Sequence, residues 1–444
     1  MEGGKHLKRL PAFFDYQVKF MQTFTLPCGL RVVCAPGQTN VVYLGIAVDA
    51  GTRHELPSES GMAHFTEHMS FKGTQRRSAR QVLSAMESVG GELNAFTGKE
   101  ETVYYCTCLE QHVSRAIDLL LDIALDSTYP QEEMNREVEV VVDEIESYLD
   151  QPAEMIYDEF ESLMFPNHPL GRNILGDAET LRTFRTADMQ RFTHRLYHPD
   201  NMVFYVLGNV EPEKVVRTIQ NSRMLQHQGA IVVAEQKFII QNDAQGPSQA
   251  PFKDILPIKG ELEGVFTRQK GTHQAHVVIG AQAFGANDPR HLHMYFLSNM
   301  LGGPAMSSRL NLALRERNGL VYTVESNCTA YTDTGVWSVY YGCDVADRAR
   351  CRRLVIRELE RLTERPMPQR TLDAARRQLK GQIGISYDNF ENVAIGMAKR
   401  FLHYGRTLSQ QQFFEQLDAI TAEDLLTTAQ TVFAPDRLLT LEYV

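Results

Sequence analysis

The sequence has few cysteines and no long apolar segment. Its seven cysteines are odd in number and thinly spread, which excludes the dense disulfide framework of a small secreted domain and favours reduced thiols. No apolar run is long enough to cross a membrane. Residues 1–20 lack the apolar core of a secretory signal, and we expect them to form an extension outside the fold. These absences predict a cytoplasmic protein that has no membrane partner.

The sequence is also short of basic residues. Lys and Arg number 45 against 55 for Asp and Glu, which gives a formal net charge of -10 at pH 7. This balance excludes a general nucleic-acid binder, because phosphate binding requires a basic surface. No glycine-rich phosphate loop follows a strand-like segment, which disfavours a doubly wound parallel sheet. A chain of 444 residues with 43% hydrophobic residues is instead typical of a globular protein with at least two cores.

What the sequence does contain is an internal repeat. The dipeptide Pro199-Asp200, which separates a helix-like from a strand-like segment, recurs 236 residues later as Pro435-Asp436. The tripeptide at 103–105 recurs at the same offset at 339–341, and Gly45 in a strand-like run has a counterpart in Gly280. Several matches near one offset indicate that one structural unit occurs twice.

A segment rich in Gly, Pro, Ser and Asn separates the two units, and it reads as an exposed linker over residues 229–260. We therefore expect an N-terminal domain over residues 1–228 and a homologous C-terminal domain over residues 261–444. Each half begins with strands, continues through amphipathic helices and returns to a strand. The predicted fold class is α+β, with two tandem homologous domains that each have a mainly antiparallel sheet covered by helices.

The segment GMAHFTEHMSFKGT carries the pattern of a metal site. On a helix, His64 and His68 lie on one face, and Glu67 points to the same side. Two imidazoles and a carboxylate then converge, whereas a zinc hydrolase requires three protein ligands and an open position for water. The pattern is short and also arises by chance, so a third ligand is required to support this interpretation.

A second predicted helix, at about residues 132–149, has an apolar stripe that Glu137 and Glu144 border. Carboxylates beside a buried stripe are costly unless a charged partner meets them. Periodicity alone leaves a second interpretation open, in which both are solvated surface groups.

Together these residues resemble the inverted zinc motif of the pitrilysin and insulinase family of peptidases. The resemblance is closest to the short two-domain branch that includes mitochondrial processing peptidase, and it covers about residues 22–444. It extends through five further segments: GTRHE at 51–55, EHMSFKGT at 67–74, GGELNAFTGKE at 90–100, HPLGRNILG at 168–176 and SSRLNLALRERNGLVY at 307–322.

The resemblance implies a role for each residue of the motif. His64, His68 and Glu144 would bind one Zn²⁺ per chain, and Glu67 would activate the attacking water. Glu137 would help to orient a ligand or the helix that carries it. The second half lacks the zinc residues, because Met294, Leu297 and Ser298 stand where the first half has His64, Glu67 and His68, so only the first half would be catalytic.

The resemblance also implies how a substrate is held. Arg315 and Tyr322 match a pair that contacts the substrate in similar peptidases; without the family, packing and a surface charge would explain them better. The segment from Glu92 to Thr97, with Asn94, Ala95 and Phe96 as the expected contact residues, is similar to an exposed edge strand whose backbone pairs with an extended peptide. Such pairing reads the main chain and would give loose sequence preference.

The predicted function is therefore that of a zinc-dependent endopeptidase that hydrolyses unfolded peptides. Larger relatives contain four such units, so a chain with two would form a homodimer, or a heterodimer with an inactive homologue. The alternative is a non-catalytic scaffold, or a processing subunit that depends on a partner.

Overall fold

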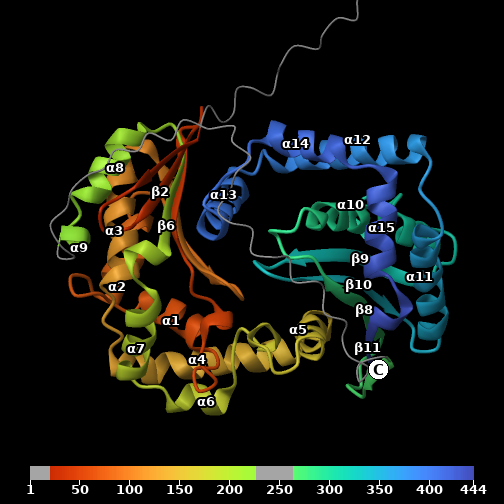
Figure 1. The fold of residues 1–444 in the computed structure, drawn as a ribbon. Helices are drawn as coiled ribbons and strands as arrows, with labels where there is room; N and C mark the ends of the chain where they lie inside the picture. Colours follow the sequence, from red (N-terminus) through yellow and green to blue (C-terminus); the bar gives the residue numbers. More distant parts are fainter. Residues whose placement is uncertain (1–20, 227–263) are drawn as a thin grey trace, which may run out of the picture.

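The computed structural model describes residues 21–226 and 264–444. The predicted N-terminal extension (1–20) and the predicted linker (229–260) lie outside the described residues. Figure 1 shows two halves, each built from one sheet and a helical cover. The prediction of an α+β fold with two mainly antiparallel sheets is confirmed.

Six strands form the first sheet in the order β1-β2-β6-β3-β5-β4. Neighbouring strands are antiparallel except for β2 and β6, which are parallel. Every residue of β6 is buried, because its continuous apolar run is covered on both faces of the sheet. The strands are β1 (Gln22–Thr25), β2 (Arg31–Pro36), β3 (Val41–Val48), β4 (Glu92–Thr97), β5 (Thr102–Leu109) and β6 (Met202–Gly208).

Five strands form the second sheet in the order β7-β11-β8-β10-β9. Here β7 and β11 are parallel and the other neighbours are antiparallel. The strands are β7 (Gly264–Arg268), β8 (Ala275–Ala283), β9 (Val321–Ala330), β10 (Gly335–Cys343) and β11 (Leu439–Tyr443). The last three strands of each sheet thus repeat one arrangement, in which β3-β5-β4 corresponds to β8-β10-β9.

The two glycines that mark the repeat occupy equivalent places in the central strands. A Cβ at Gly45 would lie 2.4 Å from the carbonyl oxygen of Tyr104, and a Cβ at Gly280 would lie 2.2 Å from that of Trp337. An aromatic ring also presses on each glycine, from Tyr205 and Phe160 respectively. Close backbone approach therefore requires glycine at both positions.

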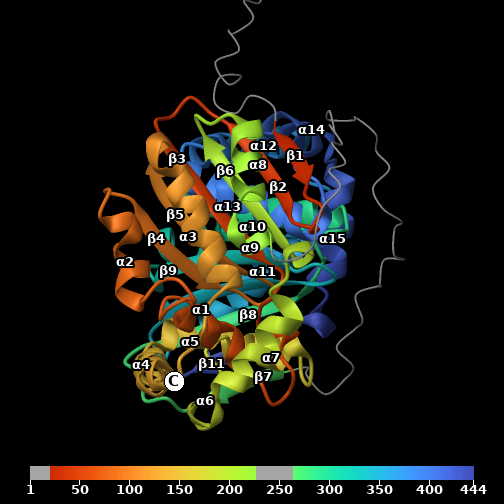
Figure 2. The ribbon, with the colours of Figure 1, turned by 90° about the vertical axis from the view of Figure 1, so that its left-hand side faces the viewer.

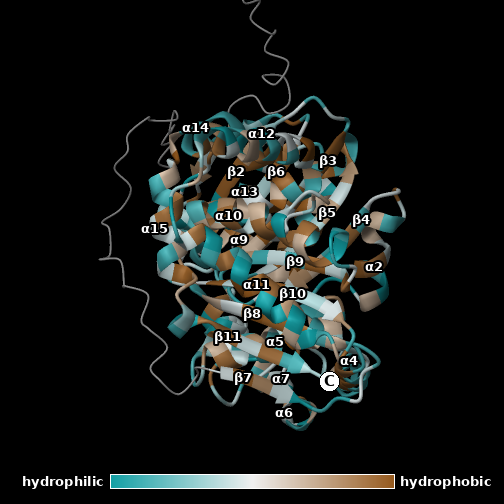
Figure 3. Ribbon diagram, turned by 90° about the vertical axis from the view of Figure 1, so that its right-hand side faces the viewer, coloured by the Kyte–Doolittle hydropathy of each residue, from teal (hydrophilic) through white to brown (hydrophobic). Residues whose placement is uncertain are grey.

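Helices of each half cover one face of the half's own sheet and bury an apolar core there. In Figure 3, brown and teal segments alternate along the helices, as expected for helices with an apolar and a polar side. The helices of the first half are α1 (Met62–Ser70), α2 (Ala79–Glu87), α3 (Val113–Leu125), α4 (Gln131–Leu149), α5 (Pro152–Met164), α6 (Ala178–Thr183), α7 (Thr186–Leu196), α8 (Pro212–Gln220) and α9 (Arg223–Gln226). Those of the second half are α10 (Arg290–Gly302), α11 (Arg348–Thr363), α12 (Gln369–Ser386), α13 (Phe390–Tyr404), α14 (Gln410–Ala419) and α15 (Ala422–Val432).

Short helical turns join these elements. They are η1 (Thr52–His54), η2 (Glu110–His112), η3 (Pro169–Gly171), η4 (Pro199–Asn201), the π-helical η5 (Asn311–Glu316) and η6 (Pro435–Arg437). The turns η4 and η6 contain the repeated Pro-Asp dipeptide, and each leads from a helix into a strand, as the sequence predicts.

The two halves exchange one helix each. Helix α5 of the first half packs on the second sheet, where Phe160 contributes to a core with Val278 and Leu441. Helix α13 of the second half packs on the first sheet, where Ala398 contributes to a core with Val203. In Figure 1, α13 accordingly lies beside β6, and α5 lies below the second sheet. Each sheet is therefore covered on its remaining face by a helix from the other half. Within the described residues, no helix is long and apolar enough to span a bilayer.

Candidate metal centre

Helix α1 is fixed at its start by a buried carboxylate. Gly61 precedes the helix in a left-handed conformation, with φ of 85°, and it has no side chain to cap the first backbone N–H groups. Glu55 replaces the missing cap, because its carboxylate accepts from Gly61 N at 3.2 Å and from Ala63 N at 2.8 Å. Burial raises the pKa of Glu55 to about 8, against the effect of these two hydrogen bonds. Phe65 is buried in the core, which turns the opposite side of the helix outward.

The outward side presents the predicted ligands to helix α4. His64 Nε2 lies 3.8 Å from Glu144 Oε1, and His68 Nε2 lies 3.5 Å from Glu144 Oε2. The ligand atoms of these three residues all lie within 4.8 Å of one another. Among the described residues, this is the group of His, Cys, Asp and Glu side chains with the spacing of a metal site. The structure therefore brings together the three residues that the sequence predicts as ligands.

The geometry and the protonation of this group fit a zinc ion. Tetrahedral zinc with bonds of about 2.0–2.1 Å places its ligand atoms about 3.3 Å apart, close to the observed separations. Burial, aided by the neighbouring His68, lowers the pKa of His64 to about 3. The ring of His64 is therefore neutral at neutral pH and can offer a lone pair. Glu144 is 44% exposed, so the group is open to solvent on one side, which leaves space for water.

Glu137 lies behind His68, where the sequence predicts an orienting group. Its Oε1 is 3.0 Å from His68 Nδ1, and its Oε2 is 2.5 Å from Lys72 Nζ. Burial alone would raise the pKa of Glu137, but the hydrogen bonds from His68 and Lys72 lower it below the ordinary value. A carboxylate at this place fixes which nitrogen of His68 faces Glu144. Lys72 was missed in the sequence, although it follows His68 at the same four-residue spacing that separates His68 from His64.

Glu67 lies on the same helix between the two histidines, and a threonine holds it. Thr97, the last residue of β4, donates from Oγ1 to Glu67 Oε2 at 2.6 Å. Burial raises the pKa of Glu67, against the lowering effect of Thr97 and His68. Thr97 was also missed in the sequence, although it ends the segment that resembles the substrate-binding strand. A base with a raised pKa and one oriented oxygen is suited to proton transfer near neutral pH.

Strand β4 is the edge of the first sheet, as predicted for the segment Asn94-Ala95-Phe96. Among the described residues it pairs with β5 on one side, where Ala95 stands opposite Tyr104, and with no strand on the other. The N–H of Ala95 is satisfied by the side chain of Asn94 at 2.9 Å rather than by a second strand. In Figure 2, β4 lies at the margin of the molecule beside α2. An extended peptide can pair with such an edge, and the strand ends at the residue that holds Glu67.

Arg315 and Tyr322 lie together in the second half, at the end of η5 and the start of β9. The guanidinium carbon of Arg315 is 6.0 Å from the centre of the Tyr322 ring, and Tyr322 is 85% exposed. In the described part of the chain, no hydrogen bond or ion pair joins either residue to α1 or α4, and Arg315 pairs instead with Glu316 at 3.7 Å. The structure thus brings the two residues of the pair together.

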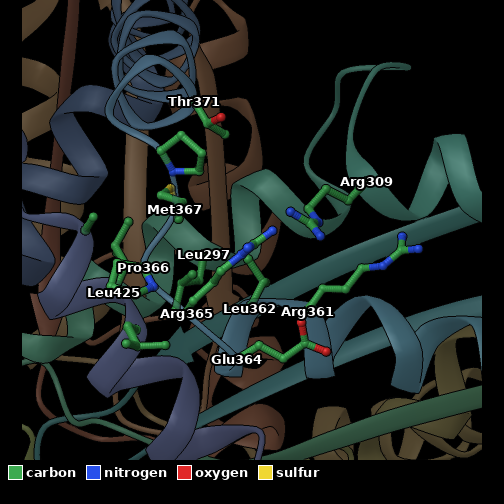
Figure 4. A pocket seen from close by; sticks show the side chains of 13 residues that line it. Leu297, Arg309, Arg361, Leu362, Glu364, Arg365, Pro366, Met367, Thr371 and Leu425 are labelled. Atoms are coloured by element: carbon green, nitrogen blue, oxygen red, sulfur yellow. The ribbon is translucent and has the colours of Figure 1, made fainter.

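In the corresponding helix of the second half, the positions equivalent to the motif carry no metal-binding side chains. In α10, Met294, Leu297 and Ser298 are buried, and Ser298 Oγ lies 2.9 Å from Ser326 Oγ. A cavity of about 320 Å³ lies in this half, between Leu297 of α10, the loop after α11 and helix α15. Figure 4 shows arginines on one side of this cavity and apolar side chains on the other. None of the predicted site residues lines it.

Comparisons with known proteins agree with this geometry. A family model described as "Insulinase (Peptidase family M16)" matches residues 31–178, and one described as "Peptidase M16 inactive domain" matches residues 183–379. An uncharacterized zinc protease of Bacillus subtilis (strain 168) is 30% identical over 422 residues, which are 95% of this chain and 98% of that protein. An uncharacterized zinc protease of Streptomyces coelicolor is 31% identical over 94% of this chain and 88% of its own length.

The fold is shared with solved structures as well. A protease from Helicobacter pylori superimposes with a TM-score of 0.82 at 21% identity, over 96% of this chain and 99% of that one. An M16-like peptidase from Alicyclobacillus acidocaldarius gives a TM-score of 0.78 at 19% identity, over 98% of this chain and 99% of that one. Two family models in tandem and near-complete coverage of relatives at 30–31% identity agree with a group in the first repeat that could hold a metal ion: the chain belongs to the insulinase family, peptidase family M16, in its short two-domain form.

Proposed function

We propose that this protein is a zinc-dependent endopeptidase that hydrolyses unfolded peptides. His64, His68 and Glu144 hold one zinc ion per chain. A zinc ion held there would supply a Lewis acid that lowers the pKa of bound water and polarises a carbonyl group. The observation that carries the proposal is the convergence of these three ligand atoms within 4.8 Å of one another, with Glu67 on the same helix.

Glu67 is the general base. Its free oxygen takes a proton from the attacking water and then delivers it to the leaving amine, while Thr97 keeps the other oxygen in place at 2.6 Å. Because Glu67 is buried, its carboxylate is a stronger base than a solvated one. One side chain thus serves both proton transfers.

The peptide binds as an added strand along β4. The backbone groups on the open edge of Asn94, Ala95 and Phe96 pair with an extended main chain, which displaces the Asn94 amide from Ala95 N. Thr97 at the end of the strand then brings the scissile bond to Glu67. Folded proteins cannot present such a strand, so this edge selects unfolded peptides.

Arg315 and Tyr322 contact the substrate from a second chain. Both side chains are exposed, and they contact each other, so they are accessible to a second chain. A homodimer would bring this pair to the metal group of the partner, and a heterodimer with an inactive homologue is the alternative. We further propose that the domains divide at the linker, with residues 1–228 as the catalytic domain and residues 261–444 as the non-catalytic one.

The substitution Glu67→Gln tests the proposal. It removes the base and keeps the shape, so hydrolysis of an extended fluorogenic peptide should fall about 10³-fold, while the protein still binds one zinc ion per chain by metal analysis. Glu179→Gln, which changes an exposed carboxylate on α6, serves as the matched control with unchanged activity.

Two outcomes would overturn the proposal. Full activity in Glu67→Gln would remove the assigned base. A wild-type protein without bound zinc and without peptidase activity would identify a scaffold or a subunit that depends on a partner. Size measurement beside the assay separates the homodimer from the heterodimer, because only a homodimer is active as the purified chain.

A further inference from the structure

Lys72 forms the outer end of a chain of charged groups that leads to the metal site. Its Nζ lies 2.5 Å from Glu137 Oε2, and Glu137 Oε1 lies 3.0 Å from His68 Nδ1. His68 Nε2, on the other side of the ring, lies 3.5 Å from Glu144 Oε2. Four side chains from two helices and the turn after α1 thus form one line.

The local structure fixes Lys72 in this position. Helix α1 ends at Ser70, and the backbone N–H of Lys72 still bonds to Met69 O at 3.1 Å. Gly73 follows with φ of 128°, a conformation that turns the chain away from the helix axis. Lys72 therefore remains on the same side as His68, one turn further on.

Glu137 requires this partner because it is buried. Only 8% of the residue is exposed, and a desolvated carboxylate is costly unless cations or hydrogen-bond donors surround it. Each of its two oxygens has one partner, His68 on one side and Lys72 on the other. Without Lys72, the second oxygen would lose its donor, and the carboxylate could rotate away from the ring.

The two histidines differ in how they are held. His68 Nδ1 faces Glu137, whereas His64 Nδ1 is buried and has no hydrogen-bond partner in the part of the chain that the structure describes. The orientation of the ligand pair therefore depends on the one ring that a carboxylate holds. A proton on His68 Nδ1 leaves the lone pair of Nε2 free to face Glu144.

We propose that Lys72 is a positioning residue for the metal site, which acts through Glu137 to hold the His68 ring with Nε2 toward the ligand group. The inference rests on the proposed zinc site. The direction of the change in zinc affinity distinguishes positioning from simple charge repulsion. By repulsion alone, a lysine near a dication would weaken zinc binding, so its loss would strengthen binding. Positioning predicts instead that loss of Lys72 weakens binding.

The test is zinc affinity, measured by competition with a chromophoric chelator. Lys72→Met should bind zinc about 10-fold more weakly or worse, the usual cost of a lost partner behind a ligand. Lys72→Arg keeps the charge and should recover most of the affinity. Lys399→Met is the control. Lys399 lies on the exchanged helix α13 and pairs with Glu101 at 2.5 Å, and its loss should leave the zinc affinity unchanged.

Two further measurements separate positioning from a merely structural ion pair. The visible spectrum of the cobalt-substituted protein should change in Lys72→Met and return in Lys72→Arg, because it reports the ligand geometry. In a Glu137→Gln background, Lys72→Met should have little further effect on affinity, since the two act through one contact. This second comparison remains decisive if Lys72→Met alone folds poorly.

The outcomes are distinct from those of the proposed function. If wild-type protein binds no zinc, the metal site itself is wrong. If wild-type protein binds zinc and Lys72→Met binds equally well or more tightly, with an unchanged cobalt spectrum, the positioning role of Lys72 is wrong and the zinc site stands.

Discussion

The two repeats bring equivalent helices together and use the contact differently. In the first repeat, α1 meets α4, and His68 Nε2 lies 3.5 Å from Glu144 Oε2. In the second, α10 meets α12, and Asn299 Nδ2 donates to Gln382 Oε1 at 2.8 Å. The amide pair is neutral and complete in itself, whereas two imidazoles beside a carboxylate leave lone pairs for a cation. Since an amide pair joins α10 to α12, the packing of equivalent helices does not require the His64–His68–Glu144 group.

A buried carboxylate is common to both repeats. Asp122 of α3 is fully buried and pairs with Arg76 at 3.1 Å and also with Arg77. Glu358, which is 236 residues further on, occupies the same place in α11 and receives Arg309 at 3.0 Å. All three arginines come from the loop after the equivalent helix, α1 for Arg76 and Arg77 and α10 for Arg309. This ion pair therefore belongs to the scaffold of both repeats, whereas the His64–His68–Glu144 group occurs in the first repeat.

The largest difference between the repeats is expected when one side chain is removed from each of the two helix contacts. His68→Ala should abolish zinc binding and lower hydrolysis by on the order of 10³-fold or more, because the site loses a ligand. Asn299→Ala should leave both properties unchanged, because no site depends on it. Metal analysis and a peptide assay on both variants check this. A comparable loss in Asn299→Ala would contradict the division between the repeats.

The next largest effect is expected on stability rather than on activity. Asp122→Ala should lower the free energy of unfolding by about 3 kcal/mol, because it leaves the partly buried guanidinium groups of Arg76 and Arg77 without their carboxylate. Glu358→Ala should act in the same direction through Arg309. Urea unfolding measures both, and zinc content per folded chain should remain at the wild-type value. If only one of the two substitutions destabilised the protein, the repeats would not share this pair.

A smaller effect is expected at the residue that holds the base. Thr97→Val removes the donor to Glu67 and should lower kcat about 10-fold, the usual worth of a hydrogen bond to a charged group. Thr97→Ser retains the donor and should recover most of the rate, and zinc content should not change in either variant. Equal rates for the valine and serine variants would contradict a role for the hydroxyl.

The smallest effects concern pH and the two exchanged helices. Burial alone would raise the pKa of Glu101, but His403 and Lys399 of α13 lower it below the ordinary value. A depressed pKa stabilises the fold above pH 4.5, and this contribution is lost as the pH falls through the folded value. Burial raises the pKa of Glu161 on α5, against the effect of Lys99. The charged carboxylate of Glu161 therefore lowers the stability of the fold at neutral pH, and this loss is relieved as the pH falls.

Urea unfolding between pH 7 and pH 3 checks this contrast. In Glu101→Gln, the loss of stability below pH 4.5 should become smaller than in the wild-type protein. In Glu161→Gln, the relief that acidification brings above pH 4.5 should disappear. Identical pH profiles for all three proteins would contradict both assignments.

The His64–His68–Glu144 group and its support Glu137 were predictable from the sequence, whereas the supports Thr97 and Lys72 were not. His64 and His68 lie four residues apart, so helix geometry alone places them on one face, and the resemblance adds Glu144. Thr97 reaches Glu67 across 30 residues, through the packing of a strand end on a helix, which no local pattern reveals. Lys72 continues the four-residue spacing, but its role depends on Glu137 of another helix.

The repeat and the fold class were also predictable, whereas the exchange of helices was not. The offset of 236 residues and the strand-like runs indicate two similar sheets. The apolar stripes of α5 and α13 indicate that each helix packs on an apolar surface. The stripe of α5, which contains Phe160, does not indicate which of the two sheets that surface belongs to. Only the three-dimensional arrangement decides which sheet a helix covers.

This exchange has a consequence for synthesis on the ribosome. The face of the first sheet that contains Val203 stays bare until residues 390–404 emerge, because its cover is α13. Helix α5 is synthesised early, and its apolar side has no partner until β8 and β11 are synthesised. Contacts of such long sequence separation form late and slowly, so the nascent chain carries exposed apolar surface until residues 390–404 are translated. Chaperone binding during translation should therefore concentrate on these two surfaces.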